Sequence, residues 1–582
     1  MLKGIFRTKS LDDIMASAES TENKLNRTLG AFNVTLLGIG AIIGAGIFAT
    51  IGTAAAGDAA RPGAGPSLML SFVITGIVCG FTALCYAELA SLVPISGSAY
   101  TYSYATLGEI IAWIIGWDLI IEYAVGNVAV AISWGNYFRT LLHGFGIDVP
   151  LWLSTDFRTA AKIPGLYASA PHLFGVPIVF NLLAFLIVAL ITLVLVWGIK
   201  ESAEFNAIMV MIKIVVLLFF IGAAFYFVKP STMAHNWVPF QPKGWGGTLA
   251  AAAVVFFAYI GFDAVSTVAE ETKNPARDMP IGIIASLIIC TIFYIAVAAV
   301  FTGMLPYKAL VGELATKQAE PLTLALEHVA PNVVWVTTLV AAGSVIAHTA
   351  VLLVFQMGQP RIFFSMARDG LLPKTFAKVH PRFKTPYVTT ILTGLVVAVF
   401  SSLMSIDEMV DLTNIGTLFA FILVCIGIPV LRHKDPHRHR PFKVPFGPYL
   451  FPLMGAASCV FLMIYLPPAS WWRFIGWLIL GLSVYTSYGY ARSTIGQELG
   501  RPSRTPVPLR VSSLGFLTCA TGLFVMPHET HPLPLIREAL NAGAPDHLRA
   551  LLGLSLALFG LLVGIAGVLG NRGSEAGTPS PA

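Results

Sequence analysis

Charged residues are scarce in this chain. Only 11% of its 582 residues are Asp, Glu, Lys or Arg, whereas 56% are hydrophobic. Water-soluble domains carry roughly 25% charged residues, so most of this chain cannot face water. The formal charge of +6 comes from basic residues gathered in a few loops, and it does not point to an acidic partner such as nucleic acid. The composition indicates an integral membrane protein.

The motifs of common enzyme and metal sites are also absent. The sequence has no Walker P-loop, no HExxH helix and no nucleophile elbow. Its six cysteines lie almost entirely in apolar runs and form no CxxC pair. The basic loop that holds His433, His437 and His439 lacks a second ligand set, and a contact with lipid headgroups is more ordinary there. We therefore expect no enzymatic activity, cofactor, metal or nucleic-acid partner.

Long apolar runs are plentiful. Fourteen of them are long enough to cross about 30 Å of hydrocarbon, although the thirteenth is short enough to be re-entrant. Their ranges are 34–55, 67–93, 110–138, 176–198, 204–228, 247–269, 281–304, 333–358, 387–404, 412–431, 449–466, 471–490, 511–526 and 549–570.

The charged loops predict the orientation of these spans. Basic residues crowd the loops after the eighth, tenth and twelfth runs, whereas the loop after the ninth has Asp407, Glu408 and Asp411 and no Lys or Arg. The positive-inside rule then places both termini in the cytosol of a multi-pass cell-membrane protein. We expect residues 1–30 to be a cytosolic segment without a cleavable signal, and residues 571–582 to be a disordered cytosolic tail.

Two of the runs are interrupted in comparable places. Gly38, Gly40, Gly44 and Gly46 fall in the first run, and each costs a helix about 1 kcal/mol relative to alanine. In lipid, backbone groups opened by such a break have no water partner, so a break is expected only where it lines a cavity or binds a ligand. The sixth run is interrupted at Gly261 in the same way.

The spacing of the two breaks predicts the architecture. They lie five spans apart, and because five is odd, a second copy of the unit would be inverted in the membrane. The expected fold is an all-α membrane protein with a five-plus-five inverted-repeat core, residues 31–431, whose helices 1 and 6 are discontinuous. Four accessory helices, 11–14, occupy residues 432–570. They lack a motif, and the alternatives for them are a partner helix, a homo-oligomer interface or lipid packing.

Three stretches carry a family resemblance. They are Arg27–Phe32 followed by GIGAIIGAGIF (38–48), FFAYIGFDAVSTVAEETKNPARDMPIGI (256–283) and MGQPRIFFSMARDGLLP (357–373). Together they resemble the cationic amino acid transporter family of the amino acid–polyamine–organocation superfamily, over roughly residues 5–490. The resemblance implies a ten-helix inverted-repeat core with accessory helices, and alternating access driven by a proton gradient.

The first break is the predicted site for a substrate carboxylate. Free N–H groups at Ile43, Gly44, Ala45 and Gly46 would begin a half-helix, and such groups attract anions. The alternative is that these glycines only permit close helix packing. Many members of the resembled family have threonine where this chain has Ala45, so a hydroxyl contact to the carboxylate is absent here.

The second break is the predicted site for the substrate ammonium group. Carbonyls near Phe257, Ala258 and Ile260 would accept it. The Phe257 ring is a candidate lid above the site, which the resemblance supports, and the alternative is ordinary packing.

Three of the ionisable residues within apolar runs are candidates for function. Lys213 lies in the middle of residues 209–217, which contain no acid to pair with it. A charge at the bilayer centre costs at least about 3 kcal/mol, so we interpret Lys213 as the proton-coupling group. The alternative is a lysine that snorkels to the interface. Glu122 and Asp263 are candidates to bind a basic side chain, directly or through water. The alternative is that they pair with Arg139 or with backbone donors.

The sequence therefore predicts a proton-coupled permease that imports cationic amino acids such as arginine, lysine and ornithine. Its partners would be the amino acid, protons and membrane lipid. One alternative is the same fold carrying small neutral amino acids such as alanine. Another is an amino acid-sensing receptor with little transport. A channel is disfavoured, because few of the helices have recurring polar residues.

Overall fold

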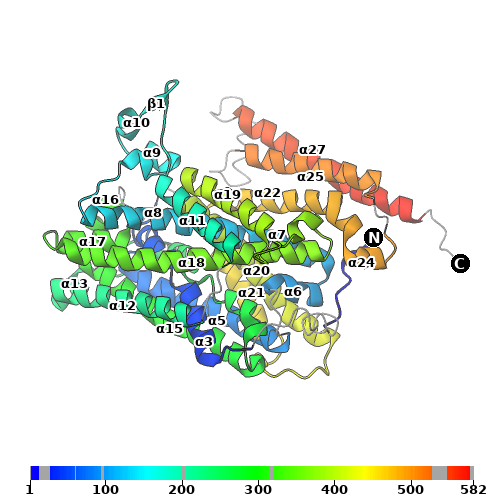
Figure 1. The fold of residues 1–582 in the computed structure, drawn as a ribbon, viewed down its shortest axis with the longest axis horizontal. Coiled ribbons are helices and arrows are strands. Elements are labelled where there is room, and N and C mark those ends of the chain that lie inside the picture. The colour runs from blue at the N-terminus through cyan, green and yellow to red at the C-terminus, as the bar shows by residue number, and fades with distance from the viewer. Residues whose placement is uncertain are drawn as a thin grey trace.

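The structure is a computed structural model that describes residues 2–11, 27–58, 61–93, 98–198, 203–314, 320–501, 504–526 and 547–576. Most of these residues are helical, and the helices run along the length of the molecule (Figure 1). The one sheet among the described residues is a hairpin of β1 (His172–Leu173) and β2 (Val176–Pro177), which projects from the bundle with α9 (Phe157–Lys162) and α10 (Leu166–Ser169). The predicted all-α membrane class is confirmed.

Helices form over all fourteen apolar runs. The first, third and sixth spans are interrupted and are described with the site. The others are α5 (Leu68–Leu92), α11 (Leu182–Trp197), α12 (Ala203–Phe227), α15 (Pro275–Met304), α18 (Val334–Arg368), α19 (Tyr387–Leu403), α20 (Ile406–Lys434), α21 (Leu450–Ile464), α22 (Pro468–Val484), α25 (Val507–Val525) and α27 (His547–Ala576).

The lengths of these helices answer one point that the sequence left open, whether the thirteenth run can span. Within the described residues, ten helices are long and apolar enough to cross a membrane, and α25 is one of them, so the short thirteenth run is long enough to span. Helices α11 and α19 are shorter, at 16 and 17 residues. Helix α21 and the helix that starts at Pro468 with α22 are long and apolar enough to cross a membrane only when they are taken together. The angle between them is 119°.

The C-terminal boundary differs from the prediction. Helix α27 continues to Ala576, so residues 571–576, expected to begin a disordered tail, are helical, and residues 577–582 lie outside the described residues. The beginning of the described chain and the end of α27 lie at the same end of the bundle (Figure 1). There the short helix α1 (Leu2–Ile5) leads into Lys9, whose Nζ lies 2.5 Å from a carboxylate oxygen of Asp369.

The accessory helices attach to the core through tryptophans. Trp117 Nε1 donates to the Trp477 carbonyl at 2.9 Å, and Trp477 Nε1 donates back to the Trp117 carbonyl at 3.1 Å. Their rings stack with centroids 4.8 Å apart, and Trp113 Nε1 donates to the Gly481 carbonyl at 3.0 Å. Helix α22 is thereby fixed to α7 (Glu109–Ile120) of the third span.

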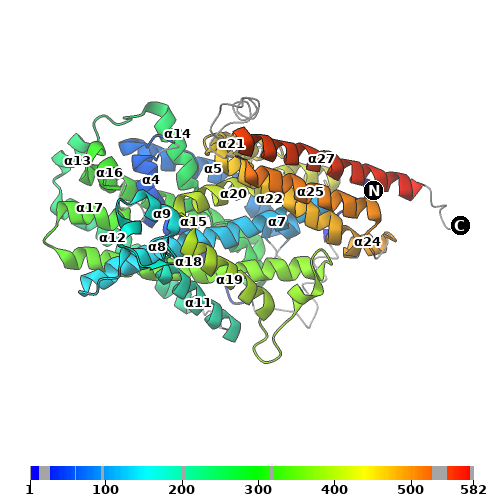
Figure 2. The ribbon, with the colours of Figure 1, turned by 90° about the horizontal axis from the view of Figure 1, so that it is seen from above.

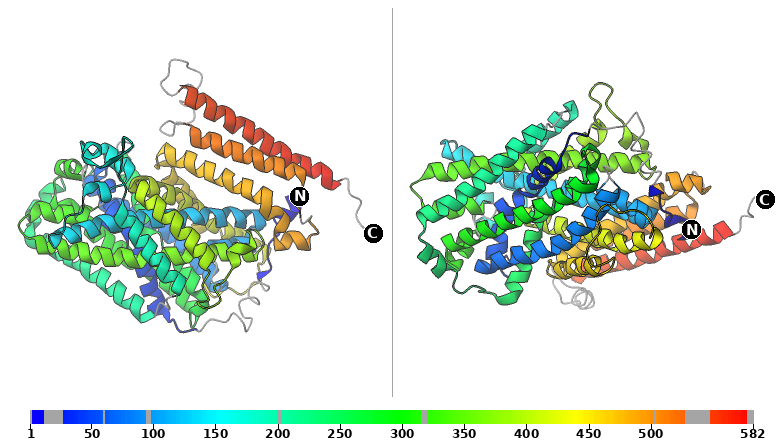
Figure 3. Two further views of the ribbon diagram at one scale, coloured as in Figure 1. Left: turned by 45° about the horizontal axis from the view of Figure 1, so that its top comes forward. Right: turned by 90° about the horizontal axis from the view of Figure 1, so that it is seen from below.

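Helices α25 and α27 pack on each other through small residues. A Cβ added at Gly515 would lie 2.3 Å from the Gly564 nitrogen, and one at Gly560 would lie 2.3 Å from the Cys519 nitrogen. Figures 2 and 3 show this pair beside α22 along one flank of the molecule. Part of the surface offered by the accessory helices is therefore used within the chain.

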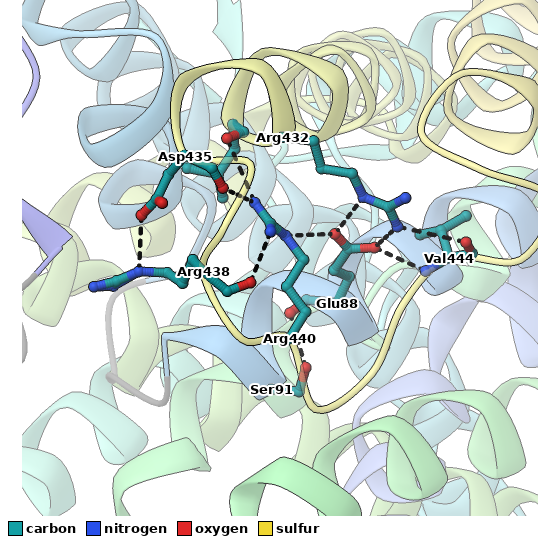
Figure 4. Close-up of polar contacts among 8 residues, drawn as sticks. Glu88, Ser91, Arg432, Asp435, Arg438, Arg440 and Val444 are labelled. Atoms are coloured by element: carbon teal, nitrogen blue, oxygen red, sulfur yellow. Dashed lines mark hydrogen bonds and ion pairs between the residues drawn. The ribbon is translucent and has the colours of Figure 1, made fainter.

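Buried ion pairs fasten both ends of α20. At its start, Arg61 Nη1 lies 2.5 Å from an Asp411 oxygen, and Arg61 Nε lies 2.9 Å from Asp58. Beyond its end, Glu88 of α5 accepts hydrogen bonds from Arg432 and, at 2.7 Å, from the Val444 N–H, with Arg440 Nε 3.5 Å away (Figure 4). Because Glu88 and Arg61 are buried and paired, these contacts hold α20 to the first two spans at both ends.

Candidate substrate site

The first span breaks where its glycines predicted. Helix α3 (Ala31–Ile42) ends at Ile42, and the next residue, Ile43, is extended at φ −74° and ψ 104°. The chain then continues as a π-helix, η1 (Gly46–Thr50), and as α4 (Ile51–Ala56). The first hydrogen bonds of this second half run from the Ile47 and Phe48 N–H groups to the Gly44 carbonyl, at 3.2 and 3.3 Å. The N–H groups of Gly44, Ala45 and Gly46, just before them, begin a half-helix and are the candidates to bind an anion. The Ile43 N–H instead donates to the Ile39 carbonyl at 2.9 Å, so the prediction that it is a free donor is wrong.

The sixth span breaks opposite the first. Helix α14 (Gly244–Val255) tightens into η5 (Phe256–Tyr259), Ile260 is extended, and the chain resumes as η6 (Ala264–Glu271). Gly261 has φ +120°, a conformation that L side chains rarely adopt, and a Cβ there would lie 2.7 Å from the Ala41 carbonyl oxygen.

The two breaks touch. A Cβ added at Gly46 would lie 2.1 Å from the Ala258 Cα, and one at Gly44 would lie 2.7 Å from a Val351 methyl. The glycines thus serve close packing as well as the break, so the packing alternative describes part of their role. The Phe257 ring is 5% exposed within η5, and its role as a lid stays a prediction.

Lys213 binds the first break directly. Its Nζ donates to the Gly40 carbonyl at 2.6 Å and to the Ile43 carbonyl at 3.0 Å, and the residue is fully buried. These are carbonyls at the end of α3, which have no helical partner beyond the break. Because the amine is buried and bound, the snorkelling alternative is wrong.

Tyr294 joins the two breaks, and sequence reasoning missed it. This buried tyrosine of α15 places its hydroxyl 2.9 Å from the Ile42 carbonyl and 2.8 Å from the Ala258 carbonyl. A tyrosine in an apolar helix gives no sequence signal of such a role, because aromatic packing is the commoner reason for it. The hydroxyl has a single proton, so at any one time it donates either to the Ile42 carbonyl of helix 1 or to the Ala258 carbonyl of helix 6.

Replacing Tyr294 with phenylalanine is expected to weaken the site without unfolding the helices. An unsatisfied buried carbonyl costs about 1–3 kcal/mol, so substrate affinity or maximal uptake should fall about tenfold. Uptake measured over a range of substrate concentrations would separate the two. Tyr226→Phe is the control, since Tyr226 is 84% exposed, and equal loss in both variants would contradict the role of Tyr294.

A second missed cluster supports the half-helix after the first break. Tyr137 donates to the Phe48 carbonyl at 2.5 Å, and the His348 ring lies 5.7 Å from the Phe48 ring. His348 is held by the Ser344 carbonyl, 2.7 Å from Nδ1, and by the Ser133 hydroxyl, 2.8 Å from Nε2. Because a carbonyl only accepts, Nδ1 carries the proton and the ring orientation is fixed.

The two predicted acids meet. Glu122 lies in η3 (Ile121–Val125), a π-helix between α7 and α8 (Gly126–Gly144), and its carboxyl group lies close to that of Asp263. Both residues are buried, and Asp263 also accepts from the Gly261 N–H at 3.2 Å. Arg139, the alternative partner, instead lies 2.8 Å from Glu320. Two carboxylates in contact repel each other in a low-dielectric interior, so a proton or a cation between them is stabilising.

The profile of a family described as amino acid permease matches residues 29–485. The chain belongs to this family. It is 48% identical to the branched-chain amino acid permease BcaP of Bacillus subtilis, over 85% of this chain and 100% of that protein. It is 44% identical to the methylthioribose transporter of the same organism, with the same coverage, and 33% identical to human cationic amino acid transporter 4, over 74% and 62% of the two chains.

As an amino acid permease, the protein is a multi-pass membrane transporter whose small-molecule substrate is an amino acid, rather than an enzyme. The resemblance to cationic transporters read from the three motifs is confirmed at the level of the superfamily, since relatives of that name match about three quarters of the chain. The matched region contains both breaks, Lys213 and the acid pair, so the candidate site lies within the part of the chain that the family shares.

Proposed function

We propose that this permease imports amino acids by proton-coupled alternating access, with Lys213 as the coupling group. The contact between Lys213 and the carbonyls of Gly40 and Ile43 carries this proposal. A protonated amine makes charge-assisted hydrogen bonds roughly twice as strong as those of a neutral amine. Loading or releasing one proton therefore changes how firmly the two halves of helix 1 are held at the break.

The substrate backbone would bind between the breaks. Its carboxylate would take the N–H groups of Gly44, Ala45 and Gly46, at the start of the second half-helix. Its ammonium group would take carbonyls of helix 6 near Phe257, Ala258 and Ile260. Tyr294 already contacts the Ala258 carbonyl, and a carbonyl oxygen has two lone pairs, so both donors fit there.

A basic substrate side chain is the class that we propose first. The carboxyl groups of Glu122 and Asp263 lie close together, and no arginine or lysine pairs with either of them within the described residues. A guanidinium or ammonium group between them would relieve the repulsion of two buried carboxylates.

A neutral substrate is the second candidate, and two observations favour it. A relative 48% identical over its full length is named for branched-chain amino acids. A proton shared by Glu122 and Asp263 would also satisfy the pair without any cation from the substrate. In that case the acids have a structural role, and only the helix breaks contact the substrate.

Uptake by proteoliposomes tests both candidates. Labelled arginine, leucine and alanine would be offered with and without an inward proton gradient, to wild type and to Glu122→Gln. The cationic proposal expects gradient-driven arginine uptake that lysine competes away and that Glu122→Gln reduces at least about tenfold, the value of one lost charged contact. Leucine or alanine uptake without arginine uptake would favour the neutral candidate. Binding of all three without uptake would instead support a receptor.

The orientation in the cell membrane remains part of the proposal. Helix α1 and the end of α27 lie at one end of the bundle, and the basic loops after α18, α20 and the twelfth span favour the cytosolic side for that end.

A further inference from the structure

The loop between α18 and α19 carries unmatched positive charge. Six basic side chains in or next to it are exposed, and none of them forms an ion pair with a described residue: Arg361, Arg368, Lys374, Lys378, Arg382 and Lys384. The acid of this stretch, Asp369, pairs with Lys9 at 2.5 Å and accepts a hydrogen bond from the Tyr100 hydroxyl at 2.7 Å. In the neighbouring loops, Arg432 and Arg501 are paired with the buried acids Glu88 and Glu109.

Half of this charge sits on a well-defined turn, residues 378–385, which we call the basic turn. His380 Nδ1 accepts the N–H groups of Arg382 at 3.2 Å and Phe383 at 3.1 Å. The backbone N–H of His380 donates to the Thr385 carbonyl at 2.8 Å, and the Phe383 ring stacks on the His380 imidazole with ring centroids 4.6 Å apart. Lys384 has φ +58°, the left-handed conformation of a tight turn. The turn therefore fixes the backbone that carries Lys378, Arg382 and Lys384.

The basic turn lies at the end of a membrane-spanning helix. The Thr385 hydroxyl donates to the Val196 carbonyl at 2.9 Å, one residue before the end of α11. The next residue, Trp197, is 66% exposed, and exposed tryptophans at helix ends mark the membrane–water interface. Val379 within the turn is also exposed, so the turn offers an apolar contact beside its cations.

We propose that the basic turn binds the headgroup of an anionic phospholipid. Arg382 and the two lysines supply donors for phosphate oxygens, and a guanidinium group can bind phosphate in a bidentate manner. Clusters of basic residues next to a membrane span attract anionic lipids. The position of Trp197 at the interface brings these donors to the level of the phosphates. Among the described residues none forms an ion pair with Lys378, Arg382 or Lys384, so their charge is available to lipid.

The full-length protein in detergent tests this proposal by native mass spectrometry with dioleoylphosphatidylglycerol and dioleoylphosphatidylcholine. Wild type should retain the anionic lipid in preference. The triple variant K378Q/R382Q/K384Q should weaken that retention about tenfold or more, since each basic residue near the surface contributes to lipid affinity. His380→Ala, which keeps all three cations but removes the acceptor that shapes the turn, should produce a partial loss.

The control is K229Q/K243Q/K308Q, which removes the same charge from exposed lysines near α13 (Pro230–Asn236) and α16 (Tyr307–Leu314), where α18 begins (Figure 1). Its lipid retention should match wild type. Equal loss in both triple variants, or equal retention of the two lipids by wild type, would overturn the proposal. A monodisperse elution profile identifies folded variants, and lipid retention is measured without transport, so this result stands apart from the proposed coupling mechanism.

Discussion

Replacing Lys213 with alanine is expected to abolish uptake driven by a proton gradient. The substitution removes the group proposed to carry the proton, and it leaves the carbonyls of Gly40 and Ile43 without their donor. Each unsatisfied buried carbonyl costs about 1–3 kcal/mol, so the first break should also lose its shape. Accumulation of labelled substrate in proteoliposomes with an inward proton gradient should fall to the level of empty liposomes.

Lys213→Gln separates the two effects. A glutamine amide still donates to carbonyls but cannot exchange a proton near neutral pH. We expect this variant to stay folded, to bind substrate and to exchange it down its own gradient, while the dependence of uptake on external pH disappears. If Lys213→Gln still accumulated substrate in response to a proton gradient, Lys213 would have a structural role and another group would carry the proton.

The broken helices were predictable because their sequence signal is physical and local. Glycine in a membrane helix exposes backbone that lipid cannot satisfy, so Gly44 and Gly261 marked both breaks. Lys213 was predictable for a related reason, since a buried charge requires partners. Its partners turned out to be backbone carbonyls, and backbone groups leave no trace in side-chain patterns.

Contacts between distant spans were less accessible to sequence reasoning. Nothing in the residues around Tyr294 distinguishes it from a tyrosine that only packs, because its role depends on the carbonyls of Ile42 and Ala258 lying on either side of its hydroxyl. Glu122 and Asp263 were each predicted as site residues. Their contact with one another depends on the approach of helices 3 and 6, which no sequence spacing sets. The pairing of α25 with α27 was not predicted either. Small residues are common in membrane helices, so the glycines of these two helices do not by themselves indicate a contact.

Placing one methyl group at Gly46 is expected to disrupt the site as severely as the loss of Lys213. The Cβ of Gly46→Ala would lie 2.1 Å from the Ala258 Cα, far inside van der Waals contact. Since the obstacle is backbone, one of the two breaks must move away. Overpacking of this kind costs about 1–3 kcal/mol of stability, and it separates the donors of helix 1 from the acceptors of helix 6. Uptake should fall at least about tenfold, with a lower melting temperature in detergent.

Gly222→Ala provides the matched control for this prediction. Gly222 also lies within a membrane-spanning helix, α12, but a Cβ added there meets nothing within 4 Å. Alanine favours a helix over glycine by about 1 kcal/mol, so this variant should transport normally and melt at the same temperature or slightly higher. The comparison isolates contact between the breaks from any general effect of removing a glycine. Wild-type uptake by Gly46→Ala would mean that the two breaks can separate without loss of function, and that substrate does not bind between them in the arrangement proposed.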